Sequence, residues 1–325
     1  MVTISLIVKG LKKPGLAFKK GKLFVAHNIE DLSRMLTQQD KLSEIVNQKE
    51  IRVVGMRRSG NHGIINWIKS QHTGKVHFLN NTLKTNPYRY IYENLRDEIP
   101  QHQHAKGFYR QEARDNFVKK DCLIYSYEDY VVKDVTDDWI FNIKHDLYFG
   151  KSSTRYDVVI IRDPFNLFAS RLKKHQKNLE KPNHQEKYLS YSRVNYLLAK
   201  NSHKTIVDLW IDYAKEYLGE TNYLKHNKVC INYNQWFADI EYRREIAEKL
   251  QVKFSDAGID KVTVFGGGSS FEGKQFDGKA TSMDVLNRWH KFCDYPQYKQ
   301  FFNEEVLKYS EKIFGHIPGT ESLIK

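Results

Sequence analysis

The sequence predicts an α/β protein in which a central, largely parallel sheet is flanked by helices. Three observations lead to this prediction. Short apolar runs each end in a polar turn, stretches with helical spacing lie between them, and the alternation continues over about 200 residues. The chain has 325 residues, of which 40% are hydrophobic, so it can bury a substantial core. We therefore expect one large domain that binds its ligands at the carboxyl ends of the strands.

The predicted strands are short and rich in β-branched or other apolar residues. Such runs lack an alternating polar face, which is typical of parallel strands that are covered on both sides. They are IRVVG at 51–55, DCLIYSY at 121–127, YDVVIIRDP at 156–164 and KVCINY at 228–233. Apolar residues recur every three or four positions in the stretches between and after these runs, which predicts helices. Those stretches are GIINWIKSQ, FNLFASRLKKHQ, HKTIVDLWIDYAKEYL and DIEYRREIAEKLQ.

The first fifty residues form a separate pattern. The stretch GLAFKKGKLFVA at 15–26 has the turn residues and apolar content of a small hairpin. Helical spacing follows in IEDLSRMLTQQDKLSEIV, and its apolar positions are Ile29, Leu32, Met35, Leu36, Leu42, Ile45 and Val46. We therefore expect an N-terminal appendage of hairpin plus helix over residues 1–50 and a main domain over residues 51–325.

The charge and the cysteines restrict the class of protein. A formal net charge of +13 attracts anions, which include nucleic acid, a membrane surface, a polyanionic substrate and a multiply phosphorylated cofactor. The three cysteines are far apart and form no CxxC pair, so we expect neither a disulfide framework nor a zinc site. No apolar run approaches the length of a membrane span. We therefore expect a cytoplasmic protein without a membrane span.

The stretch IRVVGMRRSGNHG contains the G-x4-G spacing of a phosphate-binding loop at residues 55–60, between a predicted strand and a predicted helix. Backbone amides and the helix N-terminus make such a loop an anion site. Nucleotide triphosphatases place Lys and then Ser or Thr after the second glycine, to hold the outer phosphates and Mg²⁺. Here Asn61 and His62 occupy those positions, and the cations lie upstream at Arg57 and Arg58. The loop therefore predicts an anion site that requires no metal.

This loop resembles the first motif of the sulfotransferases that use 3′-phosphoadenosine 5′-phosphosulfate (PAPS), which have a P-loop-like architecture. In GMRRSGNHGIINWI, Arg58 stands where many members have lysine, and Asn61 and His62 stand where Thr or Ser is commoner. The resemblance implies that the loop binds the cofactor's 5′-phosphate. The cofactor-binding residues that it implies here are Arg57, Arg58, Ser59, Gly60, Asn61, His62 and Gly63.

A second stretch, YDVVIIRDPFNLFASRLKK at 156–174, resembles the second motif of the same family. That motif is a strand, an arginine at its end and a serine on the following helix, which correspond here to Arg162 and Ser170. The resemblance implies that both bind the 3′-phosphate of PAPS, since a guanidinium forms bidentate bonds to phosphate and a hydroxyl can complete them. A surface ion pair between Arg162 and Asp163 is the structural alternative.

Two further stretches carry a weaker resemblance, which extends in all from about residue 51 to 315. Tyr233, in KVCINYNQWFADIEYRREIAEKLQVKF, corresponds to a tyrosine beside the adenine, although a core aromatic explains it equally well. The glycine-rich loop GGGSSFEGKQFDGKATSMDVLNRWHKF at 266–292 corresponds to a loop that closes over the 3′-phosphate. Its candidates are Phe271, Gly273 and Lys274, while a functionally silent loop is the alternative; Arg288 and Trp289 are expected to anchor the following helix.

Sulfuryl transfer from PAPS to a hydroxyl or amine places negative charge on the departing phosphate, and the product is 3′,5′-adenosine bisphosphate. We expect Arg58, with Arg57 as the alternate, to stabilise that charge. The acceptor must lose a proton to a base. The resemblance implies a base just after the strand that follows the loop helix, and there Glu128 is the first candidate and Asp129 the second. His62 and the pair His102 and His104 are rivals.

Two other functions fit parts of the sequence. A P-loop kinase would use the same loop for ATP but should keep the Lys-Ser/Thr pair. A nucleic-acid-binding protein would explain the positive charge, but Lys and Arg are spread along the chain and no nucleic-acid motif appears, so we expect no nucleic-acid partner. We expect the acceptor, a small molecule or a glycan, to contact regions 72–115 and 175–220.

Overall fold

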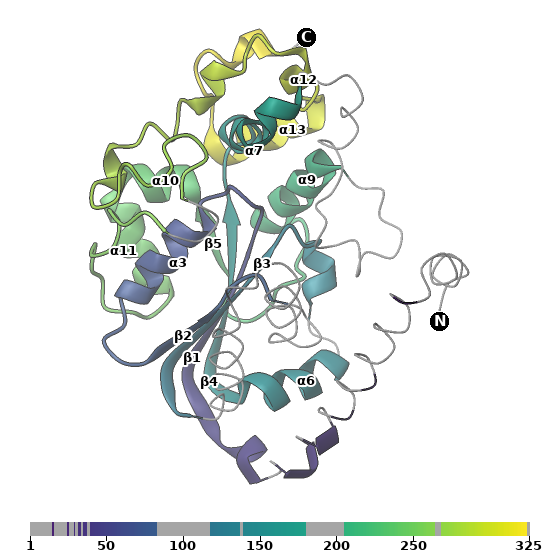
Figure 1. The fold of residues 1–325 in the computed structure, drawn as a ribbon, viewed down its shortest axis with the longest axis vertical. Helices are drawn as coiled ribbons and strands as arrows, with labels where there is room; N and C mark the ends of the chain where they lie inside the picture. The colour runs from purple at the N-terminus through teal and green to yellow at the C-terminus, as the bar shows by residue number, and fades with distance from the viewer. Residues whose placement is uncertain are drawn as a thin grey trace.

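The computed structural model describes most of the main domain and scattered residues of the first forty. The described ranges are 40–82, 118–136, 139–179, 205–263 and 268–323, with positions 15, 25, 29, 32, 33, 35, 36 and 37 near the N-terminus. They contain a five-stranded sheet in the order β2-β3-β1-β4-β5, and every pair of neighbouring strands is parallel (Figure 1). The prediction of an α/β fold with a central parallel sheet is therefore confirmed.

The strands correspond to the four predicted apolar runs and one further run. Their bounds are β1 Ile45–Gly55, β2 Val76–Leu79, β3 Lys120–Glu128, β4 Lys151–Ile161 and β5 Val229–Asn232. The sequence analysis did not identify β2, since its four residues form too short an apolar run to stand out. β1 lies at the centre of the sheet, because it pairs with both β3 and β4.

Helices cover both faces of the sheet (Figure 1). The α-helices whose bounds the structure describes are α3 Asn61–Ser70, α6 Trp139–Phe149, α7 Pro164–Leu179, α9 Ile206–Tyr217, α10 Tyr233–Ala238, α11 Ile240–Lys249, α12 Pro296–Lys299 and α13 Glu304–Phe314. The 3-10 helices are η1 Asp40–Ser43, η4 Val132–Val135, η8 Ala280–Ser282, η9 Arg288–Lys291 and η10 Thr320–Leu323. No helix within the described ranges is both long enough and apolar enough to cross a bilayer.

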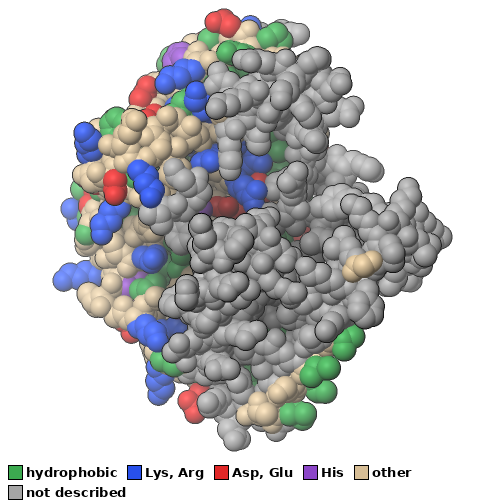
Figure 2. All heavy atoms as spheres, in the orientation of Figure 1, with side chains coloured by type: hydrophobic (Ala, Val, Ile, Leu, Met, Phe, Trp, Pro, Cys, Tyr) green, Lys and Arg blue, Asp and Glu red, His purple; other side chains and the backbone are tan. Residues whose placement is uncertain are grey.

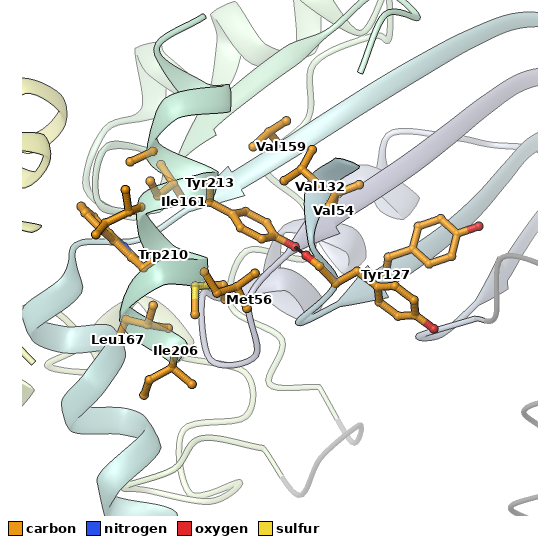
Figure 3. Packing of buried hydrophobic residues seen from close by; sticks show 14 of the residues in the cluster. Val54, Met56, Tyr127, Val132, Val159, Ile161, Leu167, Ile206, Trp210 and Tyr213 are labelled. Carbon is orange, nitrogen blue, oxygen red and sulfur yellow. Dashed lines mark hydrogen bonds between the residues drawn. The ribbon is translucent and has the colours of Figure 1, made fainter. Parts of the chain in front are cut away.

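The sheet separates two hydrophobic cores, because successive strand residues point to opposite faces. Ile51 and Val53 of β1 belong to the core beneath α3, α10 and α11, whereas Val54 belongs to the core beneath α6, α7 and α9. Figure 3 shows part of the second core, where Trp210 and Tyr213 of α9 lie near the carboxyl ends of the strands. The two cores pack against both faces of the sheet, and the loops that follow the strands form the site described below.

A buried ion cluster lies further from those strand ends. The Glu50 carboxylate accepts hydrogen bonds from Tyr125 Oη at 2.8 Å and Arg155 Nε at 3.2 Å, and it lies 2.7 Å from His145 Nε2. Burial opposes the ionisation of both Glu50 and His145. His145, with Arg155 and Ser152, outweighs burial and holds the pKa of Glu50 below its usual range, while Glu50, with Asp146, raises that of His145. The interaction therefore favours the charged form of both side chains inside the core.

The N-terminal region differs from the prediction in two places. Gly15 and Val25, which are described within the predicted hairpin, are both helical, so the hairpin prediction is wrong at these residues. The predicted helix is confirmed at Ile29, Leu32, Met35 and Leu36. Its last two apolar positions, Ile45 and Val46, belong instead to β1, because the pairing of β1 with β4 begins at Ile45. A division at residue 50 would therefore cut β1, and the division into two parts stays a prediction.

Candidate functional site

The carboxyl ends of all five strands border one cavity of about 860 Å³. Asn80 follows β2, Glu128 ends β3, the loop 57–63 follows β1, Arg162 follows β4 and Tyr233 follows β5. Lys and Arg side chains gather beside acidic groups near the middle of the face that Figure 2 shows. The residues predicted at separate strand ends are thus brought to one place by the parallel sheet.

The phosphate-loop candidate makes a tight turn between β1 and α3. Its Arg58 and Gly60 have positive φ angles of 74° and 86°, and the Ser59 amide donates to Met56 O at 3.1 Å. Amides at a helix start have no acceptor within the helix, and the first turn of α3 carries no acidic residue. The start of α3 therefore presents donors and positive potential to the cavity. Ser59 is buried and is not among the cavity-lining residues.

Gly60 is required by packing as well as by its backbone conformation. A Cβ atom at this position would lie 2.0 Å from Cε2 of Tyr233. The Tyr233 ring in turn lies 4.9 Å from the Arg162 guanidinium, which is the geometry of a cation–π contact. The predicted Tyr233 therefore borders both the phosphate loop and the second motif, and it lines the cavity together with Trp236.

Asn61 and His62 replace the usual lysine and hydroxyl, and both make defined contacts. Asn61 Nδ2 donates to Met56 O at 3.1 Å and to Glu128 Oε1 at 3.3 Å, so its side chain ties the loop to the end of β3. His62 Nε2 lies 2.8 Å from Asn80 Oδ1 and 3.8 Å from Glu128 Oε1. Both side chains therefore contact Glu128 and lie at the end of the cavity where β3 ends.

Glu128 is the carboxylate that faces this end of the cavity. Its side chain is 11% exposed, and Arg57 Nε lies 3.6 Å from its Oε2 atom. The Glu128 amide donates to Asn81 Oδ1 at 3.0 Å, which fixes the backbone at the point where β3 ends. Glu128 is therefore held by groups from α3 and from the loops after β1 and β2, while it still lines the cavity.

Asp129 has a different environment from its neighbour. It is fully buried, has a positive φ of 59°, and accepts from Arg171 Nη1 at 2.7 Å and Nη2 at 3.0 Å. The Arg57 amide also donates to it at 2.9 Å. Burial alone would raise the pKa of Asp129, but Arg171 and then Arg57 outweigh burial and lower it. Asp129 is thus an ionised anchor of the loop and is not among the cavity-lining residues.

Arg58 extends from the loop to the other side of the cavity. Its Nη1 atom donates to Gly268 O at 3.3 Å, so it connects the phosphate loop with the glycine-rich loop. Burial lowers the pKa of Arg58, while the negative charge of Glu128 opposes that shift. Arg57 lies at the edge of the same cavity with a side chain that is 36% exposed.

Arg162 and Ser170 meet as the second motif predicts. Arg162 Nη1 lies 3.0 Å from Arg58 O and 3.4 Å from Ser170 Oγ, and its Nη2 donates to Val285 O. Both side chains line the cavity, although each is almost completely buried. Within the described ranges, Nε of Arg162 is buried without a hydrogen-bond partner. Asp163 caps α7 by accepting from the Asn166 amide at 2.7 Å, so it is not merely a surface ion-pair partner.

Arg288 is a second buried guanidinium at this cavity. Its Nη2 atom donates to Ser269 Oγ at 2.9 Å and to Glu272 Oε2 at 2.6 Å. Its Nε atom is buried and has no hydrogen-bond partner among the described residues. Burial lowers the pKa of Arg288 and the charge of Arg162 lowers it further. The expected anchoring role is supported by its backbone amide, which donates to Asn166 Oδ1 at 2.8 Å, but the side chain also lines the cavity.

The three candidates of the glycine-rich loop lie beside the cavity. The Ser269 and Gly273 backbones pair with each other at 2.9 and 3.1 Å, which closes a short turn. Phe271 packs against Phe292, with Arg288 5.0 Å from its ring centre, and Lys274 is exposed. None of Phe271, Gly273 and Lys274 is among the cavity-lining residues, whereas Ser269 and Ser270 are. The turn therefore directs its serine end, and not its Phe-Glu-Gly-Lys end, to the cavity.

Some predicted residues cannot be compared with the structure, and some site residues were not predicted. His102 and His104 lie outside the described residues, as do 83–115 and 180–204 of the expected acceptor regions. Asn80, Ser269 and Arg171 were not singled out from the sequence. The apolar run VHFL before Asn80 is the signal that could have identified it. Among the described residues, no group of three or more His, Cys, Asp or Glu side chains could hold a metal ion.

Comparison with known proteins gives matches among solved structures. No protein-family model matches the chain. No curated protein matches it either. Among solved structures, the chain is similar to mouse sulfotransferase SULT7A1 complexed with PAP, with a TM-score of 0.42 and 10% sequence identity. The match covers 88% of this chain and 91% of that one.

Proposed function

We propose that this protein transfers the sulfuryl group of PAPS to a hydroxyl or amine of an acceptor, a small molecule or a glycan. The observation that carries this proposal is the pair of buried guanidinium groups of Arg162 and Arg288. Each borders the cavity that the phosphate loop borders, and each has a buried Nε atom without a partner among the described residues. Buried donors without partners are costly, so such a pair is suited to an anionic ligand.

The residues present fit a nucleotide with phosphates at both ends of its ribose. The start of α3, with Arg57 and Arg58, would bind the 5′-phosphosulfate end. Arg162, Ser170 and Arg288 would bind the 3′-phosphate through charged hydrogen bonds. Tyr233 would lie beside the purine, with Trp236 also lining that part of the cavity. This assignment of the two phosphate groups agrees with the positions of the two motifs, which follow β1 and β4.

PAPS would supply the activated sulfuryl group. Negative charge would develop at the 5′-phosphate as that group departs, and a preorganised cation there lowers the barrier. Arg58 is our first candidate for this role and Arg57 the alternate. An arginine stays protonated at neutral pH, so it would stabilise charge and would not donate a proton.

Glu128 is the proposed base that takes the acceptor proton. It lines the cavity, while Arg57, Asn61 and His62 lie within 3.3 to 3.8 Å of its oxygens. Asp129 is less suited, because Arg171 engages both of its oxygens. His62 stays the alternative, since it reaches the same end of the cavity beside Asn80. The acceptor would then approach from the side where β2 and β3 end.

Calorimetric titration with 3′,5′-adenosine bisphosphate tests the proposal directly. We expect tight binding without metal and weaker binding of ATP, with or without Mg²⁺. Arg162→Ala should weaken the bisphosphate about 10- to 100-fold, since a hydrogen bond to a charged group contributes about 1.5–3 kcal/mol. Arg244→Ala is the matched control, because Arg244 is half-exposed and pairs with Glu241 on α11. Preference for Mg²⁺-ATP, or no nucleotide binding, would reject the proposal.

A further inference from the structure

The N-terminal helical region carries a stripe of large apolar side chains that faces solvent. Val25, Ile29, Leu32 and Leu36 are 55%, 62%, 58% and 66% exposed. Each of the four is helical, and their spacing of four, three and four residues is the spacing of one side of a helix. Single exposed apolar residues are ordinary, but four at the spacing of one helix side indicate an interaction surface.

The stripe is exposed although the same helical region also contacts the rest of the protein. Met35, directly before Leu36, is partly buried and packs against the larger hydrophobic core. The Thr37 hydroxyl donates to Ser33 O at 2.8 Å, which is a helical contact between positions four apart. The helix therefore contacts the body through one side, while the apolar stripe points away from it.

The sequence before the stripe is strongly basic. Residues 1–29 contain six lysines and no acidic residue, and the first acidic residue is Glu30. The lysines are Lys9, Lys12, Lys13, Lys19, Lys20 and Lys22. An apolar helix side next to a lysine-rich segment is the combination that binds membrane interfaces, because apolar residues enter the acyl boundary while lysines attract anionic headgroups.

We propose that this stripe, defined by Val25, Ile29, Leu32 and Leu36, binds the surface of a membrane that contains anionic lipids. A second copy of the chain is a less suitable partner. Two copies paired through the stripe would each carry the six lysines that precede it in the sequence, and like charges repel. An anionic lipid surface complements both features at once. This proposal does not depend on the proposed sulfuryl transfer.

Sedimentation of the full chain with lipid vesicles tests the proposal. We expect binding to vesicles of phosphatidylcholine with phosphatidylserine, weaker binding to phosphatidylcholine alone, and release by added salt. Ile29→Gln combined with Leu32→Gln should weaken binding at least tenfold. The matched control is Ile240→Gln on α11, where an apolar side chain is 42% exposed outside the stripe. This control should leave binding unchanged.

A second variant tests the charge. Replacing Lys19, Lys20 and Lys22 by Gln should weaken binding to the anionic vesicles about a hundredfold, since each lysine near such a surface contributes about 1 kcal/mol. Thermal unfolding of both variants should match that of the unmodified chain. Absence of vesicle binding, or equal binding to neutral vesicles, would overturn the proposal. Light scattering that shows a dimer, lost in the Ile29/Leu32 variant, would assign the stripe to a second copy instead.

Discussion

The Asp129 carboxylate and the Arg171 guanidinium form a bidentate ion pair, with distances of 2.7 and 3.0 Å. The pair joins the end of β3 to α7, and Arg171 also donates to Arg57 O at 3.2 Å. Asp129 in turn accepts from the Arg57 amide. One buried pair thus contacts the phosphate loop through both of its members. Its removal should therefore lower the free energy of unfolding and loosen the contacts of the loop.

We predict that Arg171→Ala lowers the free energy of unfolding by about 3–5 kcal/mol, because it removes the partner that engages both oxygens of the buried Asp129 carboxylate. Urea denaturation measures this loss. The double variant Arg171→Met with Asp129→Asn should recover part of it, since the uncompensated charge is gone. The exposed pair of Arg244 and Glu241 supplies the control, where Arg244→Ala should change stability by less than about 1 kcal/mol. A similar effect of both alanine variants would contradict the assigned role of Asp129.

The same pair predicts a pH dependence of stability. The pKa of Asp129 is lowered in the folded chain, so its contribution is present above the unfolded value of about 3.9 and is lost as pH falls through the folded value. Urea denaturation from about pH 7 downward should therefore show a loss of stability in acid that is smaller in Asp129→Asn. If the variant and the unmodified chain lose stability in parallel, Asp129 does not carry this dependence.

Gly60→Ala should weaken nucleotide binding and stability together. The substitution combines a positive φ of 86° with a Cβ atom 2.0 Å from the Tyr233 ring. Gly219→Ala separates the two effects, because Gly219 has a φ of 76° and no atom within 4 Å of the added Cβ. We expect Gly219→Ala to cost about 1–2 kcal/mol from backbone strain alone and Gly60→Ala to cost more. Equal losses in urea denaturation would show that Tyr233 moves freely aside.

Glu128→Gln should lower turnover about 10²- to 10⁴-fold and leave the affinity for 3′,5′-adenosine bisphosphate within about twofold. The amide keeps the size of the carboxylate but cannot accept the acceptor proton. Turnover is measured with labelled PAPS and an acceptor found by screening, and affinity is measured by calorimetry. Unchanged turnover in this variant, with a loss in His62→Gln, would transfer the role of base to His62.

The sequence predicted the sheet well because four of its strands are dense apolar runs. It predicted Arg162 with Ser170 because both lie in one continuous strand-turn-helix segment, whose geometry is local. The phosphate loop was recognisable for the same reason. β2 was missed because a run of four residues is too short to be distinguished from a loop, and Asn80 at its end was missed with it.

The remaining differences depend on contacts between distant residues. Nothing in the neighbourhood of Asp129 indicates that Arg171, on another element, will engage both of its oxygens. The glycine-rich loop was recognised, but the pairing of Ser269 with Gly273 turns Phe271 and Lys274 away from the cavity lining.

In the N-terminal region, Gly15 and Gly21 suggested a turn, yet Gly15 and Val25 are helical. Helical propensity and turn chemistry compete there, and local composition alone favoured the turn.

The central position of β1 has a consequence for the order in which the molecule assembles. Ile51 of β1 pairs with Ile124 and with Tyr156, which are far away in the chain, and parallel pairs of this kind form late because long loops must close first. The loop after β1 cannot take its final shape until both neighbours are aligned. Arg288, at the same cavity, is synthesised later still. The proposed nucleotide site would therefore be complete only in fully folded molecules. A ligand added during refolding would bind those molecules and not the folding intermediates.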